Sequence, residues 1–328
     1  MKKTAIICLA LVLCLAGSAA FASGSKEAAA KTTYNVGICQ FVQHVALDAA
    51  TQGFQDAITD ALGKDNVKFN YQNASADMAT VTTIINSLVS DNVDLILANA
   101  TPPLQAAAAA TETIAILGTS VTDYATALGM SLDSNGATGI NVSGASDLAP
   151  LDKQAEMIKE LFPSVKNVGL LYCSAEANSI YQITAMEGYL DAMGIGHTRY
   201  AFTDSNDVAS VTQSACNGSD VIYIPTDNTA ASCTEAIRNV VEPAKVPVVA
   251  GEEGICAGCG VATLTISYYD LGYTTGKMAV EVLKGADVSK MPIEYAANPI
   301  KKYNAELCSV LGVTVPADYT AILFGGSK

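Results

Sequence analysis

Apolar and polar positions alternate along the chain in blocks that predict strands and helices in turn. From residue 34 onward, short β-type runs are each followed by longer runs whose apolar residues recur at helical spacing. Such alternation is typical of parallel β-α-β units with right-handed crossovers. In the first half the pattern predicts strands over 34–39, 67–71, 94–98 and 114–118, and helices over 46–62, 78–89 and 104–110.

The same order begins again at residue 167. Residues 35–41 read NVGICQF and residues 167–173 read NVGLLYC, while DLILA at 94–98 matches DVIYI at 220–224. In the second half the pattern predicts strands over 167–172, 197–202, 220–224 and 246–251, and helices over 179–193, 208–216 and 231–241. Because the strands recur in the same order, we expect two similar Rossmann-like lobes, each an α/β unit with a parallel sheet.

The last part of the chain is predicted to return between the lobes. It contains a helix over 268–284, a strand over 293–300 and a helix over 305–311, with crossings near 145–150, 265–267 and 300–304. We therefore expect a multi-crossing hinge. Lobe 1 is assigned to 34–147 plus 266–302, and lobe 2 to 148–265 plus 303–328.

The first residues have the features of a secretory signal peptide. Lys2 and Lys3 precede an apolar run too short to span a bilayer, and Ala20-Phe21-Ala22 is typical of a cleavage site. We favour cleavage after Ala22 over lipidation at Cys14, because in Leu11-Val12-Leu13 the bulky Leu13 stands where a lipidation site has a small residue. Residues 1–22 are thus assigned to the signal peptide and 23–33 to a linker. The mature protein is expected to be exported, to the periplasm or the extracellular face of the membrane.

Charge and cysteine content narrow the class of protein. The formal net charge is −14 and the only arginines are Arg199 and Arg238, which argues against a nucleic-acid partner. Seven cysteines follow the signal peptide, and Cys256 and Cys259 form a CxxC pair in a Gly-rich stretch that we expect to be a loop. A redox pair and half of a zinc site are alternatives, but a structural disulfide or plain thiols fit that loop better.

Candidate binding residues lie at the predicted carboxyl ends of the strands, where open parallel sheets bind ligands. Lobe 1 presents hydroxyl, amide and imidazole groups, and lobe 2 adds acidic groups. The candidates are Gln40, His44, Asn99, Thr101, Thr119, Ser120 and Thr122 in lobe 1, and Ser174, Glu176, Asn178, Ser179, Thr226, Asp227, Asn228 and Glu253 in lobe 2.

This asymmetry predicts a ligand with a cationic end and an anionic or polar end. An ammonium would face Asp227, with Glu176 and Glu253 as rival partners, and a carboxylate would take hydroxyls and backbone N–H groups near Thr101 and Ser120. Structural roles compete with this assignment, since Thr101 and Ser179 are also suitable helix N-caps. We further expect that Asp227→Ala abolishes binding without unfolding the protein.

No catalytic, metal or cofactor motif emerges. The chain has no G-x-S-x-G, P-loop, H-E-x-x-H or strand-linked G-x-G-x-x-G sequence, and neither His44 nor His197 has a recognisable nucleophile beside it. We therefore predict no catalytic residues, no metal and no cofactor.

As a set, six segments resemble one family of ABC-transporter substrate-binding proteins, whose members include tryptophan and tyrosine receptors. They are QFVQHVALD (40–48), GTSVTD (118–123), SAEANS (174–179), TDN (226–228), GEEG (251–254) and SYYDLG (267–272). The resemblance covers residues 34–316. It implies a periplasmic-binding-protein type I fold and delivery of a small solute to an ABC permease. Val45, in place of the family's usual proline, and the CxxC pair depart from the family pattern.

The sequence therefore predicts a monomeric solute-binding protein that closes two lobes on a small zwitterion, an aromatic or other apolar amino acid. A sugar, nucleoside or other solute is the alternative ligand; the absence of Trp argues against a sugar, although 14 Tyr remain. A sensor-linked receptor and an exported enzyme are alternative functions.

Overall fold

The protein is described here from a computed structural model, which defines residues 33–296 and 298–323. The signal peptide, the linker up to residue 32 and the lipidation candidate Cys14 lie outside these residues. Among the described residues, none of the helices has the length and apolar character needed to cross a bilayer.

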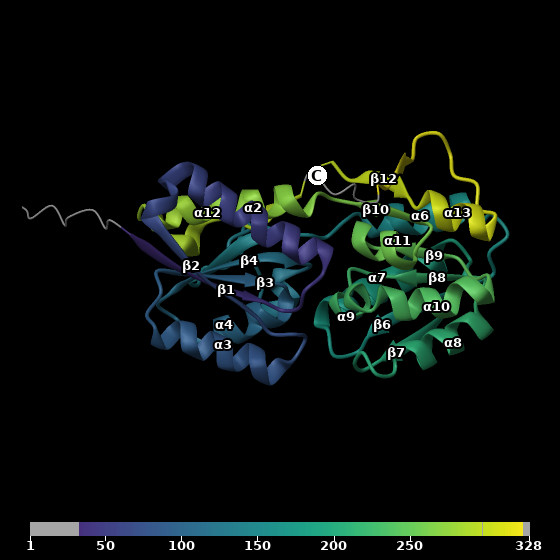
Figure 1. The fold of residues 1–328 in the computed structure, drawn as a ribbon, viewed down its shortest axis with the longest axis horizontal. Coiled ribbons are helices and arrows are strands. Elements are labelled where there is room, and N and C mark those ends of the chain that lie inside the picture. The colour runs from purple at the N-terminus through teal and green to yellow at the C-terminus, as the bar shows by residue number, and fades with distance from the viewer. Residues whose placement is uncertain (1–32, 297, 324–328) are drawn as a thin grey trace, which may run out of the picture. The chain divides into compact units, whose positions relative to one another are not determined.

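Lobe 1 is built on a parallel sheet with strand order β2-β1-β3-β4-β5-β11. The strands are β1 (Tyr34–Gln40), β2 (Val67–Asn73), β3 (Leu95–Asn99), β4 (Ala115–Val121), β5 (Val142–Ser146) and β11 (Glu294–Tyr295). Helices α2 (Val45–Leu62) and α12 (Tyr268–Leu283) cover one face, and α3 (Met78–Ser90) and α4 (Thr101–Ala110) cover the other (Figure 1). The short helix α5 (Tyr124–Leu128) follows β4.

Lobe 2 repeats this arrangement in the order β7-β6-β8-β9-β10-β12-β13, with only β12 antiparallel to its neighbour β10. Its strands are β6 (Asn167–Cys173), β7 (Gly196–Phe202), β8 (Val221–Ile224), β9 (Val248–Ala250), β10 (Ala262–Thr265), β12 (Ile300–Tyr303) and β13 (Thr320–Ala321). Its helices are α6 (Leu151–Leu161), α7 (Ala177–Ala192), α8 (Val208–Gly218), α9 (Asn228–Ser232), α10 (Thr234–Ala244), α11 (Glu253–Cys259) and α13 (Ala305–Leu311). Both sheets reverse their strand order beside the first strand of the lobe, β1 or β6, which is where doubly wound sheets bind ligands.

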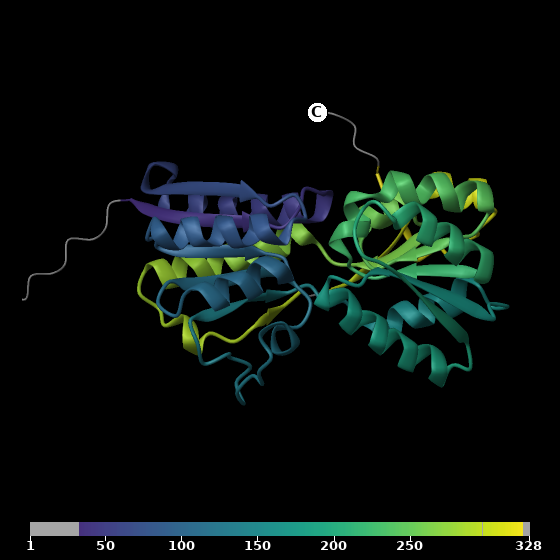
Figure 2. The same ribbon diagram turned by 90° about the horizontal axis from the view of Figure 1, so that it is seen from below.

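The chain passes between the lobes after β5, before α12 and between β11 and β12, and Figure 2 shows these connections between the two sheets. The predicted strand over 293–300 was wrong, because it is two short strands in different sheets. Asn298 has a left-handed backbone (φ 57°) and Pro299 has no N–H, so a continuous strand is interrupted there. Residues 300–302, assigned to lobe 1 from the sequence, pair with β10 of lobe 2.

Two further expectations need correction. The helix predicted over 231–241 is two helices, α9 and α10, which meet at Cys233. The CxxC pair lies on helix α11 directly after β9 rather than in a loop, and all seven cysteines from Cys39 onward are free thiols. Burial raises the pKa of both Cys256 and Cys259, so these thiols are packing groups rather than reactive ones.

Helices α2 and α12 are held in close contact by glycines. A Cβ atom added at Gly272 would overlap the backbone oxygen of Ala50, and one added at Gly276 would lie 2.6 Å from that of Phe54. This contact attaches α12, which directly follows a crossing between the lobes, firmly to lobe 1.

We predict that Gly272→Ala lowers the free energy of unfolding by about 1–3 kcal/mol, because the added methyl group forces two backbones apart. Gly188→Ala is the matched control, since Gly188 lies on α7 with nothing within 4 Å of the added Cβ. It should be neutral or more stable by about 0.5–1 kcal/mol. Urea denaturation of both variants measures the difference, and equal stabilities would contradict the contact.

Candidate functional site

A cavity lies between the lobes, where the strand ends of both sheets meet. It is narrow and is lined by His44, Leu47, Ser120, Asp147, Thr226, Asp227, Asn228, Ala231, Glu252 and Tyr268. We call it the central cavity. His44 and Leu47 come from the start of α2, Asp147 follows β5, and the acidic residues of lobe 2 follow β8 and β9.

Three buried carboxyl groups face this cavity, and no lysine or arginine lines it. Asp147, Asp227 and Glu252 are 4%, 1% and 2% exposed. Burial raises the pKa of Asp147 to about 6, and of Asp227 and Glu252 to about 7. For Asp227 the neighbouring charge of Glu176 adds to this effect. The electrostatics of the cavity therefore favour a cation over an anion.

Each of these carboxyl groups is positioned by hydrogen bonds. Asp147 accepts from Tyr268 OH (2.8 Å) and Thr122 Oγ1 (3.2 Å). Asp227 caps α9 and accepts from the backbone of Cys173 (2.6 Å) and Ala230 (2.8 Å) and from Ser179 Oγ (2.7 Å). Glu252 caps α11 and accepts from the backbone N–H groups of residues 254 and 255.

Two polar contacts join the lobes around the cavity. His44 Nε2 lies 3.3 Å from Asn228 Oδ1, and Gln182 Nε2 donates to Thr122 Oγ1 at 3.2 Å. Gln182 also donates to Thr226 Oγ1 at 2.6 Å. Burial lowers the pKa of His44, against the opposing effect of its bond to Asn228 and of nearby carboxylates, so the imidazole adds no fixed positive charge.

Unpartnered polar atoms gather at the predicted strand ends. Among the described residues, eight buried side-chain nitrogen or oxygen atoms have no hydrogen-bond partner, and six of them belong to predicted site residues. These six are His44 Nδ1, Asn99 Oδ1, Thr101 Oγ1, Thr119 Oγ1, Ser120 Oγ and Asn178 Oδ1. Two of the six, His44 and Ser120, line the central cavity. Since buried polar groups are normally satisfied, these two atoms are where a ligand or ordered water would complete the site.

Several residues that the sequence predicted as ligand contacts instead form hydrogen bonds within the protein around the site. Gln40 bonds Asp48 (2.7 Å) and Thr51 (2.7 Å), and Asn99 donates to Thr51 (2.9 Å), which fixes the start of α2 against β1 and β3. Ser174 is exposed and donates to Phe202 O at 3.1 Å.

Thr101 and Asn178 line a smaller space between α4, α5 and α7. Pro102 and Pro103 remove backbone N–H donors from the first turn of α4, so this helix start offers a carboxylate less than expected from the sequence.

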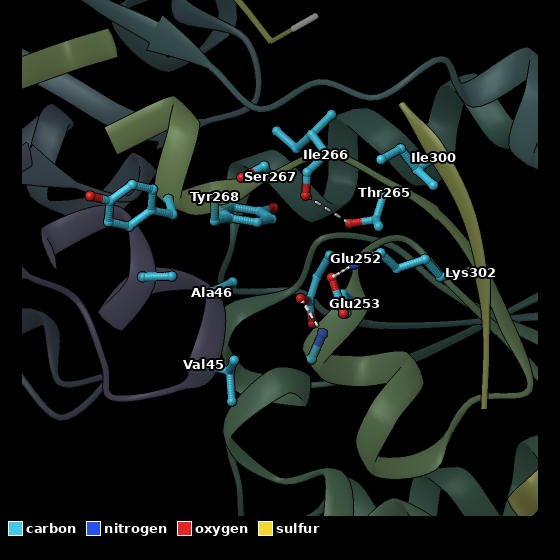
Figure 3. Close-up of a pocket in the computed structure, with 13 residues that line it drawn as sticks. Val45, Ala46, Glu252, Glu253, Thr265, Ile266, Ser267, Tyr268, Ile300 and Lys302 are labelled. Carbon is cyan, nitrogen blue, oxygen red and sulfur yellow. Dashed lines mark hydrogen bonds and ion pairs between the residues drawn. The ribbon is translucent and has the colours of Figure 1, made fainter. Parts of the chain in front are cut away.

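Glu176 and Glu253, the expected rivals of Asp227, are already engaged. Glu176 accepts five hydrogen bonds, including 2.6 Å from Asn228 Nδ2 and 2.8 Å from Thr229 Oγ1. Glu253 forms a 2.6 Å ion pair with Lys302 in a second cavity beside the hinge, the hinge-side cavity. Figure 3 shows Glu253 turned toward Lys302, while Glu252 and Tyr268 border both cavities.

Sequence reasoning missed Asp147, Tyr268 and the choice of Glu252 over Glu253. Asp147 directly follows β5, whose sequence VSGAS is too rich in small residues to predict a strand. Tyr268 belongs to the SYYDLG segment. Its hydroxyl group was the one feature of the sequence that could have indicated a site residue there. The sequence does not show which of the adjacent residues Glu252 and Glu253 faces the central cavity, because this depends on the residue at which α11 begins.

Fold and site together define a two-lobed, periplasmic-binding-protein-like type I receptor. The profile of the family described as "ABC transporter substrate binding protein" matches residues 35–321, and the chain belongs to that family. The family comprises substrate-binding proteins rather than enzymes. The expected fold class and protein class are confirmed.

Three similar proteins carry further information. The tyrosine-binding protein of Clostridioides difficile is 38% identical over 82% of this chain and 78% of its own. A Streptococcus pneumoniae domain in complex with L-Trp has 31% identity and a TM-score of 0.85, covering 89% of this chain and 100% of that one. A ligand-free, open substrate-binding protein with adhesive properties from Clostridium difficile has 36% identity and a TM-score of 0.67, covering 88% and 99%.

We predict that Glu176→Gln lowers the free energy of unfolding by about 3 kcal/mol, because an amide nitrogen would face donors that now share a carboxylate. Ser174→Ala, which removes one hydrogen bond from an exposed residue nearby, should change it by less than about 1 kcal/mol. Urea denaturation compares the two. An E176Q variant as stable as the wild type would contradict a structural role for this carboxylate.

Proposed function

We propose that this protein captures a zwitterionic aromatic amino acid, tyrosine or tryptophan, and delivers it to an ABC permease. The observation that carries the proposal is the central cavity, with its three buried carboxyl groups and no lysine or arginine in its lining. A ligand must bring the positive charge, and an α-ammonium does so. The names of the relatives, a tyrosine-binding protein and an L-Trp complex, favour an aromatic side chain.

The ammonium is proposed to lie between Asp147 and Asp227. Asp147 belongs to lobe 1 and Asp227 to lobe 2, so a cation that contacts both links the lobes. Leu47, Ala231 and Tyr268 supply apolar surface for the ring. The unpartnered hydroxyl of Ser120 is a donor for the ligand's carboxylate.

The lobes are proposed to be in a closed arrangement here. The TM-score is 0.85 with the L-Trp complex at 31% identity but only 0.67 with the open, ligand-free protein at 36%. Sequence distance does not explain that order, whereas a ligand-bound arrangement of the lobes does. The contacts of His44 with Asn228 and of Gln182 with Thr122 support closure.

The remaining expectations from the sequence stay proposals. We propose a monomer without catalytic activity, exported by a signal peptide that is cleaved after Ala22. We also propose lobe boundaries as assigned above, with 300–302 moved to lobe 2 because β12 pairs there.

We predict that the purified protein binds L-tyrosine or L-tryptophan, and that 3-(4-hydroxyphenyl)propionate, which lacks the ammonium, fails to bind. Isothermal calorimetry measures the affinities, and native mass spectrometry identifies any ligand that copurifies. Because the chain contains no Trp, the fluorescence of bound tryptophan is read directly. A copurified sugar or nucleoside, or turnover of an added substrate, would contradict the proposal.

We predict that Asp147→Asn and Asp227→Asn each weaken binding by about 2–5 kcal/mol, because each leaves the buried ammonium with one carboxylate fewer. Asn at position 227 keeps one acceptor oxygen but turns an amide nitrogen toward a donor, so urea denaturation accompanies the affinity measurement. Asp227→Ala would also deprive Cys173, Ala230 and Ser179 of their acceptor, so it should destabilise the fold, contrary to the expectation from the sequence. Affinities within about twofold of wild type would exclude these side chains as ammonium partners.

A further inference from the structure

The central cavity has more negative charge than the ligand proposed above can neutralise. A zwitterion has no net charge, so three ionised carboxyl groups would leave the occupied cavity at −3. The groups packed around it offer little relief: burial lowers the pKa of His44 and so disfavours its charged form, Tyr268 is a phenol, and Lys302 is paired with Glu253 on the hinge side. Glu176 adds a further acid behind Asn228, and Asp48 lies near Gln40.

The central cavity also offers few strong hydrogen-bond donors to the ligand's carboxylate. The side chains that line the cavity offer hydroxyl groups at Ser120, Thr226 and Tyr268 but no guanidinium or ammonium group. The Tyr268 hydroxyl already donates to Asp147. A protonated carboxyl group would solve both problems, since it removes one negative charge and donates a short, strong O–H···O hydrogen bond.

The hydrogen bonds distinguish the three candidates for that proton. Asp227 accepts three hydrogen bonds, from Cys173, Ala230 and Ser179, which favour its ionised form. Asp147 accepts hydrogen bonds from two hydroxyl groups and is the proposed lobe 1 partner of the ammonium. Glu252 accepts only two backbone N–H groups, and the charges of Glu253 and Asp147 both act against its ionisation.

We propose that closure around the amino acid takes up one proton from solvent, which Glu252 holds as a neutral carboxylic acid that donates to the ligand's carboxylate. The proposal rests on the proposed function, because it needs a zwitterionic ligand. Glu252 is then a ligand-contacting residue whose protonation state sets the affinity.

The direction of the pH dependence follows from the pKa of Glu252 in the two states. Burial raises the pKa of this carboxyl group to about 7 with the lobes closed, and we take the ordinary value of about 4.5 for it when open lobes expose it to solvent. A raised pKa stabilises closure fully below the open-state value, and this contribution is lost as pH rises toward the closed-state value. Affinity should therefore fall by up to about tenfold per pH unit between these two pKa values and level off above the higher one.

The test is calorimetric titration with L-tyrosine and L-tryptophan at about pH 6, in two buffers with different ionisation enthalpies. The difference in heat gives the number of protons exchanged, and we expect uptake of about one. At about pH 8.5 the uptake should be close to zero. Equal heats in both buffers at pH 6, or net release, would overturn the inference while leaving binding intact. No binding heat in either buffer would overturn the proposed function itself.

Two variants test whether Glu252 is the residue that takes up the proton. Glu252→Gln keeps the shape of the neutral acid and an oxygen to cap α11, so it should abolish proton uptake and flatten the affinity profile with pH. Glu235→Gln removes an exposed carboxylate from α10 of the same lobe and should retain both. Uptake that persists in E252Q would overturn the assignment to Glu252. Should E252Q fail to fold, the wild-type comparison of buffers still decides whether a proton is taken up.

Discussion

The electrostatic cost of burying three carboxyl groups in one cavity is the constraint on which the site depends. Nothing in the lining of the central cavity neutralises Asp147, Asp227 and Glu252, and each is held in place by hydrogen bonds rather than by an ion pair. Ion pairs do occur elsewhere, as between Glu253 and Lys302, one residue away. The cavity is therefore destabilised until a cation enters it, which is the property that a receptor for an ammonium ligand needs.

The fold supplies this arrangement because it brings strand ends together from two sheets. Asp147 follows β5 in lobe 1, while Asp227 and Glu252 follow β8 and β9 in lobe 2. The acids are thus divided between the lobes, and closure is what gathers them. The close packing of α12 on α2 through Gly272 keeps the α12 connection fixed to lobe 1, so the relative movement of the lobes is confined to the short connecting segments.

The sequence was informative wherever periodicity was strong. The repeated strands β1 and β6 were predicted to within a few residues, because burial on both faces of a parallel sheet requires continuous apolar runs. Helices α2, α3 and α4 were predicted equally well, whereas α5 and α6 were missed. The prediction of secondary structure failed in segments rich in small residues. β5 was missed for that reason, and Asp147 with it. Glycines made α11 look like a loop, although the Glu252 cap and the burial of its cysteines stabilise a helix there.

The polar atoms around the cavity explain why closure should depend on the ligand. Closure by itself brings His44 to Asn228 and Gln182 to Thr122, at 3.3 and 3.2 Å, both long for strong hydrogen bonds. Against these two contacts stand the unpartnered His44 Nδ1 and Ser120 Oγ in the cavity lining, and each costs about 1–3 kcal/mol when it is buried away from water. A ligand that satisfies them contributes free energy only in the closed state, and such differential binding is what shifts the equilibrium between open and closed lobes. The polar groups that make the empty closed form unfavourable therefore also favour closure around a ligand that can satisfy them.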